Sequence, residues 1–260
     1  MSKNEHINQN KSSTDDFDPY QPDNVALYEV IYGKNLISLG GLAAIDNMFS
    51  DFNIRGLKAL DIGFGIGGVA FYLAEKYKMK VAGIELHLWM VEYARTHTPT
   101  ILLNSLEFHT YNSNGRFPYE PETFDLVYSK GVLNHVADKI SLFKQVNTVL
   151  KPNGLFVIAD WIFPMAATEN LAPLVCETKE SYEQALLNTG FSEISFRNDS
   201  KLFLNYAKEL LTRLSNNQAP IKQKYGEELF LIIQKQHEEL IEKIQQHQKI
   251  ATRIVAKKTS

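Results

Sequence analysis

The chain of 260 residues has one cysteine, Cys176, and no apolar run near the roughly 20 residues that a membrane-spanning helix needs. A single cysteine cannot form an internal disulfide, which fits a reducing compartment. There is no long basic run, and the net charge of −3 does not suggest a surface for nucleic acid or anionic membranes. Residues 1–18 also lack the apolar centre of a signal peptide. These absences predict a cytoplasmic protein with small-molecule partners, no nucleic acid and no membrane insertion.

What the chain does contain is typical of a globular domain, with 44% apolar and 22% charged residues. Residues 1–18 are polar and are expected to form a mobile tail ahead of a single domain over residues 19–260. Short apolar runs predict five strands, which alternate with helical patterns, at residues 59–62, 81–84, 106–110, 124–128 and 155–159. This alternation predicts an α/β fold with a mostly parallel sheet covered by helices on both faces.

The two ends of the domain depart from this alternation. Residues 24–32 and 41–52 show helical spacing ahead of the first strand. After a sixth strand at residues 191–196, two long helical patterns predict a helical insertion over residues 198–248. We interpret residues 250–255 as a seventh, antiparallel strand, so the expected sheet has seven strands.

The most informative segment is residues 60–68, Leu-Asp-Ile-Gly-Phe-Gly-Ile-Gly-Gly, followed by Glu85 at the end of the next apolar run. The pattern predicts a strand, a tight turn and the start of a helix, in which glycines allow a ligand to approach the backbone. Glu85, at the tip of the neighbouring strand, can accept hydrogen bonds from both hydroxyls of a ribose. The glycine turn and this acid together predict an adenosine-type cofactor. Because the glycine spacing also fits a dinucleotide fold, a nicotinamide-dependent reductase is an alternative at this point.

Further segments favour S-adenosylmethionine. Asp61 lies two residues before the first glycine, and the runs Phe-Asp-Leu-Val-Tyr-Ser at residues 124–129 and Leu-Lys-Pro-Asn-Gly-Leu-Phe-Val-Ile-Ala-Asp at residues 150–160 follow later. Together they resemble the motif series of the class I methyltransferases. The resemblance implies a Rossmann-like sheet, S-adenosylmethionine as the methyl donor and S-adenosylhomocysteine as the product.

The strand, turn and helix start at residues 60–68, which we call the glycine corner, also indicate which residues would hold the cofactor. Backbone amides after Asp61 and around Gly63 and Gly65 are expected to face the methionine part of the cofactor, and Leu86 one face of adenine. After the third strand, methyltransferases usually offer an aspartate to the adenine amino group. Here an asparagine carbonyl must accept that hydrogen bond, and we assign this place to Asn112 and Ser113.

A more specific resemblance covers residues 20–258. Residues 28–41, Tyr-Glu-Val-Ile-Tyr-Gly-Lys-Asn-Leu-Ile-Ser-Leu-Gly-Gly, are similar to the amino-terminal signature of the phosphoethanolamine and phosphobase methyltransferases. In those enzymes the segment folds over bound cofactor. The resemblance therefore implies that residues 19–53 form lid helices, that Ile37 and Ser38 touch the cofactor and that Tyr20 closes the active site.

The resemblance also supplies a catalytic pair. Residues 128–135, Tyr-Ser-Lys-Gly-Val-Leu-Asn-His, match the stretch in which those enzymes carry a histidine, here His135. Methyl transfer to nitrogen needs a lone pair, and a histidine that titrates near neutrality suits removal of the ammonium proton, with Tyr20 orienting the imidazole. Ser129 and Lys130 of this stretch are assigned to the cofactor. The alternative is that His135 only caps or flanks the helix that follows.

Two departures from that group bear on the substrate. Gly131 stands where those enzymes have an acid that helps to hold the amine, and residues 165–179 contain no arginine or tyrosine to clamp a phosphate. The remaining pocket residues, Tyr28, Asp160 and Trp161, offer aromatic faces and a carboxylate, which suit an amine without phosphate.

We therefore expect methyl transfer from S-adenosylmethionine to a small-molecule acceptor, most favourably an amine. The alternatives are O- or C-methylation of a small aromatic or quinone-like metabolite, and a non-catalytic protein that only binds S-adenosylmethionine. No metal ligands are assigned, and the sequence does not predict an oligomeric state.

Overall fold

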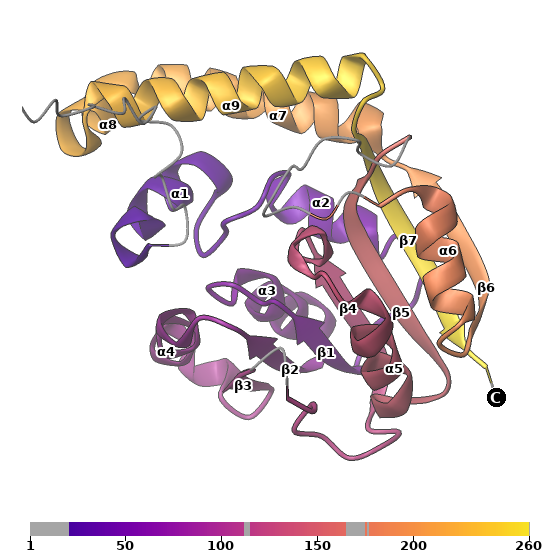
Figure 1. Cartoon of the computed structure of the whole chain (residues 1–260). Helices are drawn as coiled ribbons and strands as arrows, with labels where there is room; N and C mark the ends of the chain where they lie inside the picture. The colour runs from indigo at the N-terminus through magenta and orange to yellow at the C-terminus, as the bar shows by residue number, and fades with distance from the viewer. Residues whose placement is uncertain (1–20, 112–114, 165–174, 176, 260) are drawn as a thin grey trace, which may run out of the picture.

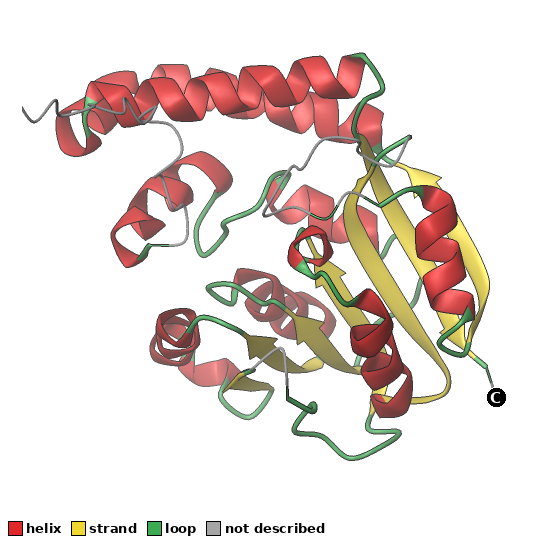
Figure 2. Ribbon diagram, viewed as in Figure 1, coloured by secondary structure: helices red, strands yellow, loops and turns green. Residues whose placement is uncertain are grey.

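The computed structural model describes residues 21–111, 115–164, 175 and 177–259, and the predicted mobile tail lies outside them. They contain a seven-stranded sheet in the order β3-β2-β1-β4-β5-β7-β6 (Figure 2). The strands are β1 Lys58–Ile62, β2 Lys80–Glu85, β3 Leu106–Thr110, β4 Phe124–Lys130, β5 Leu150–Ile162, β6 Phe191–Asn198 and β7 Ile250–Lys258. Strands β1 to β5 pair in parallel, whereas β7 pairs antiparallel with both β5 and β6. This confirms the predicted sheet and its antiparallel last strand.

Helices cover both faces of the sheet (Figure 1). One core contains residues from α2 Gly41–Met48, α3 Gly68–Tyr77 and α4 Leu88–His97, and the other from α5 Lys139–Val149 and α6 Lys179–Leu187. Neighbouring residues of β4 enter opposite cores, because Leu126 belongs to the first and Val127 to the second. Burial on both faces explains why the parallel strands are continuous apolar runs in the sequence.

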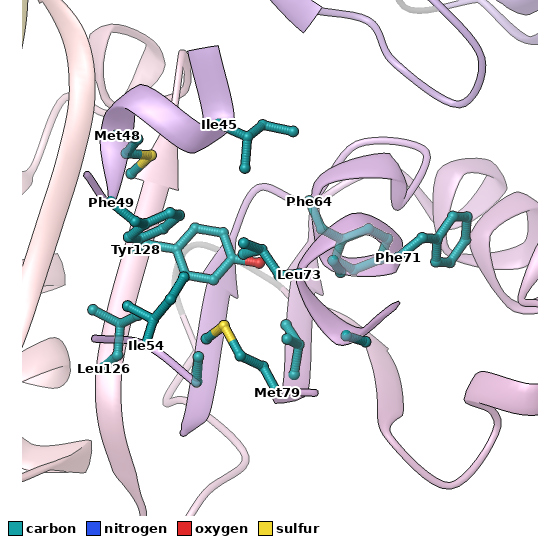
Figure 3. Close-up of a cluster of buried hydrophobic side chains, with 14 of the residues drawn as sticks. Ile45, Met48, Phe49, Ile54, Phe64, Phe71, Leu73, Met79, Leu126 and Tyr128 are labelled. Carbon is teal, nitrogen blue, oxygen red and sulfur yellow. The ribbon is translucent and has the colours of Figure 1, made fainter. Parts of the chain in front are cut away.

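The two helices that were predicted to form the lid are anchored differently. α2 packs into the core of the sheet, where Ile45 and Met48 lie near Tyr128 of β4 (Figure 3). Asp46 of the same helix accepts hydrogen bonds of 2.8 Å from the hydroxyls of Tyr72 and Tyr77. α2 ends at Met48 rather than at the predicted residue 52. It is therefore part of the scaffold beneath the site.

The other predicted lid helix, α1 Val25–Tyr32, packs against the insertion and follows the short 3-10 helix η1 Pro22–Asn24. Leu27 and Ile31 share an apolar cluster with insertion residues that include Leu210 and Phe230. Nη1 of Arg213 donates a 2.7 Å hydrogen bond to the Ile31 carbonyl, which satisfies one acceptor at the end of α1. The insertion thus holds α1 over the sheet.

The insertion consists of α7 Ser200–Asn216, α8 Gln218–Tyr225 and α9 Glu227–Gln245 (Figure 1). The sequence did not predict α8, because it is polar and buries only Ile221. Gly226 (φ +91°) separates α8 from α9, where one helical pattern had been expected to begin at residue 225. No helix in the described part of the chain has the length and apolar content that crossing a bilayer requires.

Candidate functional site

The glycine turn lies at the carboxyl end of β1, as predicted. The chain turns through Gly63 (φ +72°) and Gly65 (φ +58°), backbone conformations that favour glycine. A Cβ atom on Gly65 would lie 2.7 Å from Cδ1 of Ile37, and one on Gly63 would lie 2.6 Å from Val132. The turn is therefore closely covered by the segment after α1 on one side and by the segment after β4 on the other.

Glu85 faces this turn from the end of β2. Its side chain is buried, and Oε2 accepts a 3.0 Å hydrogen bond from the Gly65 amide. Oε1 accepts from the Leu86 amide at 2.8 Å. Leu86 is 58% exposed, so core packing does not explain this residue. The acid and the apolar side chain thus lie beside the glycine turn, as a ribose and adenine site requires, although the individual contacts stay predictions.

Asp61 and Ser129 have internal partners beneath the turn. The Tyr128 hydroxyl donates a 2.9 Å hydrogen bond to Oδ2 of Asp61, and Oγ of Ser129 donates to the Ile62 carbonyl at 3.1 Å. Burial raises the pKa of Asp61 to about 8, against the hydrogen bond from Tyr128. Both side chains therefore brace β1 against β4, and their assignment to the cofactor stays a prediction.

Lys130, at the end of β4, joins the sheet to the segment after α1. Nζ donates hydrogen bonds to Oγ of Ser38 at 2.6 Å and to the Leu39 carbonyl at 3.0 Å. Burial lowers the pKa of Lys130 to about 8, while the carboxylates of Asp160 and Asp61 oppose the shift. The fold thereby brings together two predicted cofactor residues, Ser38 and Lys130, that are 92 positions apart.

A small cavity of about 60 Å³ lies beside Lys130. Trp161 lines it from β5, and Phe203 lines it from α7, with their rings edge to face at 5.5 Å. Gly131 (φ +70°) also lines it, and a Cβ atom there would meet no atom within 4 Å. The sequence gave no signal for Phe203, because an aromatic residue in an amphipathic helix resembles ordinary packing. The cavity is therefore shared between the sheet and the insertion.

Asp160 holds the segment that carries His135. Its Oδ2 accepts hydrogen bonds from the amides of Leu133 at 2.7 Å and Asn134 at 3.3 Å, and Oδ1 accepts from the Trp161 amide at 2.8 Å. Burial raises the pKa of Asp160, and these backbone donors oppose the shift. The carboxylate thus fixes the 3-10 helix η3 Leu133–His135 at the end of β5. This positioning task was not foreseen, and the predicted contact of Asp160 with the acceptor stays a prediction.

His135 is the last residue of η3 and lies near Asp160, which lines the cavity. The cap of α5 is Asp138, whose Oδ1 accepts from the Ser141 amide at 2.9 Å, so His135 is not needed as a cap. Partial burial lowers the pKa of His135 below its usual value of 6.5, Lys249 lowers it further, and Asp160 opposes both effects. The imidazole is therefore neutral at neutral pH and able to accept a proton.

Lys249 is a second residue that the sequence reasoning missed. Its Nζ lies 4.7 Å from the centroid of the Trp161 ring. Lys249 immediately precedes β7, and the antiparallel pairing of Ile250 with Ile162 brings the start of β7 to the carboxyl end of β5. Only the pairing of the strands places this lysine near the site.

The remaining assigned residues are Tyr20, Tyr28, Asn112 and Ser113. Tyr20, Asn112 and Ser113 lie outside the described residues. Tyr28 lies in α1, where its ring stacks on that of Tyr32 at 5.9 Å. Its predicted contact with the acceptor is not tested. Within the described ranges, no group of three or more His, Cys, Asp or Glu residues is arranged to hold a metal ion.

Comparisons with known proteins agree with this geometry. Residues 54–259 match the model of a family described as a methyltransferase domain. The phosphoethanolamine N-methyltransferase of Triticum aestivum is 30% identical over 217 residues, which cover 80% of this chain and 43% of the relative. This chain thus spans less than half the length of that curated relative.

Solved structures show the same fold. Phosphoethanolamine N-methyltransferase 2 of Haemonchus contortus, in complex with phosphomonomethylethanolamine and S-adenosylhomocysteine, superposes with a TM-score of 0.85 at 22% identity, over 93% of this chain and 59% of that one. A putative sarcosine dimethylglycine methyltransferase from Galdieria sulphuraria gives a TM-score of 0.79 at 16% identity, over 93% and 98% of the two chains.

Proposed function

Because this chain belongs to the methyltransferase domain family, we propose that it transfers the methyl group of S-adenosylmethionine to the nitrogen of a small amine. The observation that carries the choice of nitrogen is the position of His135. A histidine whose pKa is held below 6.5 stands at the carboxyl edge of the sheet, beside the cavity-lining Asp160. An amine is the acceptor that needs such a base, because its ammonium form has no lone pair to attack with.

The residues of the glycine corner fit the cofactor. A Cβ atom on Gly63 or Gly65 would collide with the side chain of Val132 or Ile37, so the turn requires glycine and its backbone lies directly beneath these two side chains. The Glu85 carboxylate is aimed at the same turn and can accept hydrogen bonds from ribose hydroxyls, and Leu86 offers an exposed apolar face for adenine. When bound, S-adenosylmethionine supplies an electrophilic methyl group on its sulfonium sulfur. The rest of the cofactor is the leaving group and becomes the neutral thioether S-adenosylhomocysteine.

On the acceptor side, a ring nitrogen of His135 takes one proton from the ammonium group of the substrate. The freed lone pair then forms the new N–C bond as the S–C bond breaks. Asp160 keeps η3, and with it the imidazole, in place through the amides of Leu133 and Asn134. Trp161 and Phe203 provide apolar walls, which exclude water and strengthen the electrostatic effects of the site.

The segment after α1 covers the cofactor side. Ile37 packs over Gly65, and Ser38 is fastened to Lys130 of the sheet. The relatives support an amine acceptor, since their printed names describe methylation of phosphoethanolamine and of sarcosine or dimethylglycine. We also propose that the protein works in the cytoplasm, which its single cysteine supports.

The proposal is tested by turnover with methyl-labelled S-adenosylmethionine. The acceptor panel contains ethanolamine, phosphoethanolamine, glycine, dimethylglycine and simple phenols, and the labelled product is identified by mass spectrometry. N-methylated product from any amine supports the proposal. Methylation of phenols alone would replace it with an O- or C-methyltransferase, and cofactor binding without any product would make the chain a non-catalytic binding protein.

A further inference from the structure

The cavity at the acceptor side of the site is lined on the sheet side by residues with little or no side chain. These are Gly131, Ala159 and Ala251. A Cβ atom on Gly131 would meet no atom within 4 Å, so this side stays open. Two aromatic rings also line the cavity, that of Trp161 from β5 and that of Phe203 from α7. The volume of about 60 Å³ therefore depends on where these rings are held.

The ring of Phe203 is held between two other aromatic rings. It lies edge to face against Trp161 at 5.5 Å and against Tyr206 at 5.6 Å. Tyr206 in turn packs on the turn before α2, because a Cβ atom on Gly40 would lie 2.8 Å from its ring. Side chains packed in this way resist displacement, so the wall that Phe203 forms is firm.

The start of α7 is fastened to the opposite side of the same cavity. The Asp199 amide donates a 2.8 Å hydrogen bond to the Ala251 carbonyl, and the Ala251 amide donates one of 3.2 Å to Oγ of Ser200. One turn later, the Phe203 amide donates to the Asp199 carbonyl at 3.0 Å. Because Ala251 lines the cavity itself, the distance between Phe203 and the sheet is fixed by the helix. The cavity cannot widen unless α7 moves.

The cavity lies between the side of the proposed base and the cover of the glycine corner. Asp160 lines it and holds η3, which ends at His135. Ser38 and Leu39 line it from the segment that covers the glycine corner. An acceptor nitrogen that gives its proton to His135 and faces the methyl donor therefore has this cavity beside it. Another group on that nitrogen would extend into the cavity.

We propose that Phe203 is a specificity-determining residue of the acceptor site, and that its ring limits the size of the group carried by the acceptor nitrogen. The inference rests on the proposed function, since it concerns what the same site admits. A group larger than the cavity would have to displace a ring that Trp161 and Tyr206 hold, and such overpacking is unfavourable. Short substituents are accepted and long or aromatic ones are rejected. The selection comes from the helical insertion rather than from the sheet.

The test uses calorimetric titration of the full chain in the presence of S-adenosylhomocysteine. The probes are two series, glycine and ethanolamine with an N-methyl, N-ethyl, N-propyl or N-benzyl group. They are compared in the wild type, in Phe203→Ala and in Phe203→Leu, which gives a smaller change if the alanine variant does not fold. Leu202→Ala is the matched control, because Leu202 is the neighbouring apolar residue of α7, is 38% exposed and lies outside the described lining of the cavity.

In the wild type, the N-propyl and N-benzyl probes should bind at least about 10-fold more weakly than the N-methyl probes. Phe203→Ala should tighten binding of the large probes by about 10-fold and weaken that of the N-methyl probes, which lose contact with the wall. Leu202→Ala should keep the order of the wild type.

A size preference that shifts in the Phe203 variants and not in Leu202→Ala supports the inference. The same order of affinities in the wild type and in both Phe203 variants would overturn it, as would failure of the wild type to bind any member of either series. Turnover of the same probes with labelled S-adenosylmethionine is scored separately. Size-selective binding without methylated product would remove the proposed function but leave the site. Methylated product with a size preference that ignores Phe203 would do the reverse.

Discussion

Replacement of Gly68 by alanine tests how closely the segment after α1 is seated on the glycine corner. Gly68 is the first residue of α3 and is buried. A Cβ atom there would lie 2.0 Å from the carbonyl oxygen of Asn35, whereas ordinary contacts begin at 3.4 Å. The obstacle is backbone, so the segment between α1 and α2 must retreat by about 1.4 Å, the difference between those two distances.

Helix propensity and packing act in opposite directions at this position. Alanine in place of glycine would stabilise a helix by at most about 1 kcal/mol. Overpacking costs about 1–3 kcal/mol, and the hydrogen bond of 2.8 Å from the Asn35 amide to Oε1 of Glu29 is strained as well. We expect a net loss of about 1–2 kcal/mol, or about 2–8 °C in Tm for a chain of this size. Ile37 and Ser38 lie two and three residues after Asn35 in the same segment, so affinity for S-adenosylmethionine should fall too.

The assay combines thermal unfolding with calorimetric titration of S-adenosylmethionine. Gly56→Ala is the control, because Gly56 (φ +74°) has no atom within 4 Å of a Cβ position and is strained only by its backbone conformation. The control should lose stability yet keep its cofactor affinity. A Gly68→Ala variant with a raised Tm and unchanged affinity would show that the segment is not seated as described.

Glu85→Ala should weaken S-adenosylmethionine binding by about 10- to 100-fold in calorimetry, since the ribose loses a charged acceptor, and unchanged affinity would end the ribose assignment. His135→Ala should leave cofactor affinity unaltered but lower kcat by about 10²- to 10⁴-fold, with normal turnover as the contrary result. Because the pKa of His135 is lowered, the acid limb of the kcat/KM profile should lie below pH 6.5 in the wild type and move upward in Lys249→Met. An acid limb at the same pH in Lys249→Met as in the wild type would show that Lys249 does not influence the pKa of His135.

The residues of the cofactor half of the site could be predicted from the sequence because they lie close together along the chain. The strand, the glycine turn and the following helix occupy consecutive residues, and Glu85 ends the next strand of the same unit. Parallel strands end at one edge of the sheet, so their order alone brings these residues together. The extra length of β5 was less readable, since Asp160 interrupts the apolar run that ends at Ala159 and pairing with β7 extends the strand to Ile162.

The sequence by itself determined the family fold, the seven strands and the chemistry at the glycine corner, because periodicity, glycine spacing and strand-end acids are local properties. Only the tertiary structure decided what surrounds the acceptor. Antiparallel insertion of β7 carries Lys249 to the edge where β5 ends, α7 contributes Phe203, and backbone amides occupy Asp160. These contacts join residues far apart in the chain, and no local pattern encodes which of two distant side chains will meet.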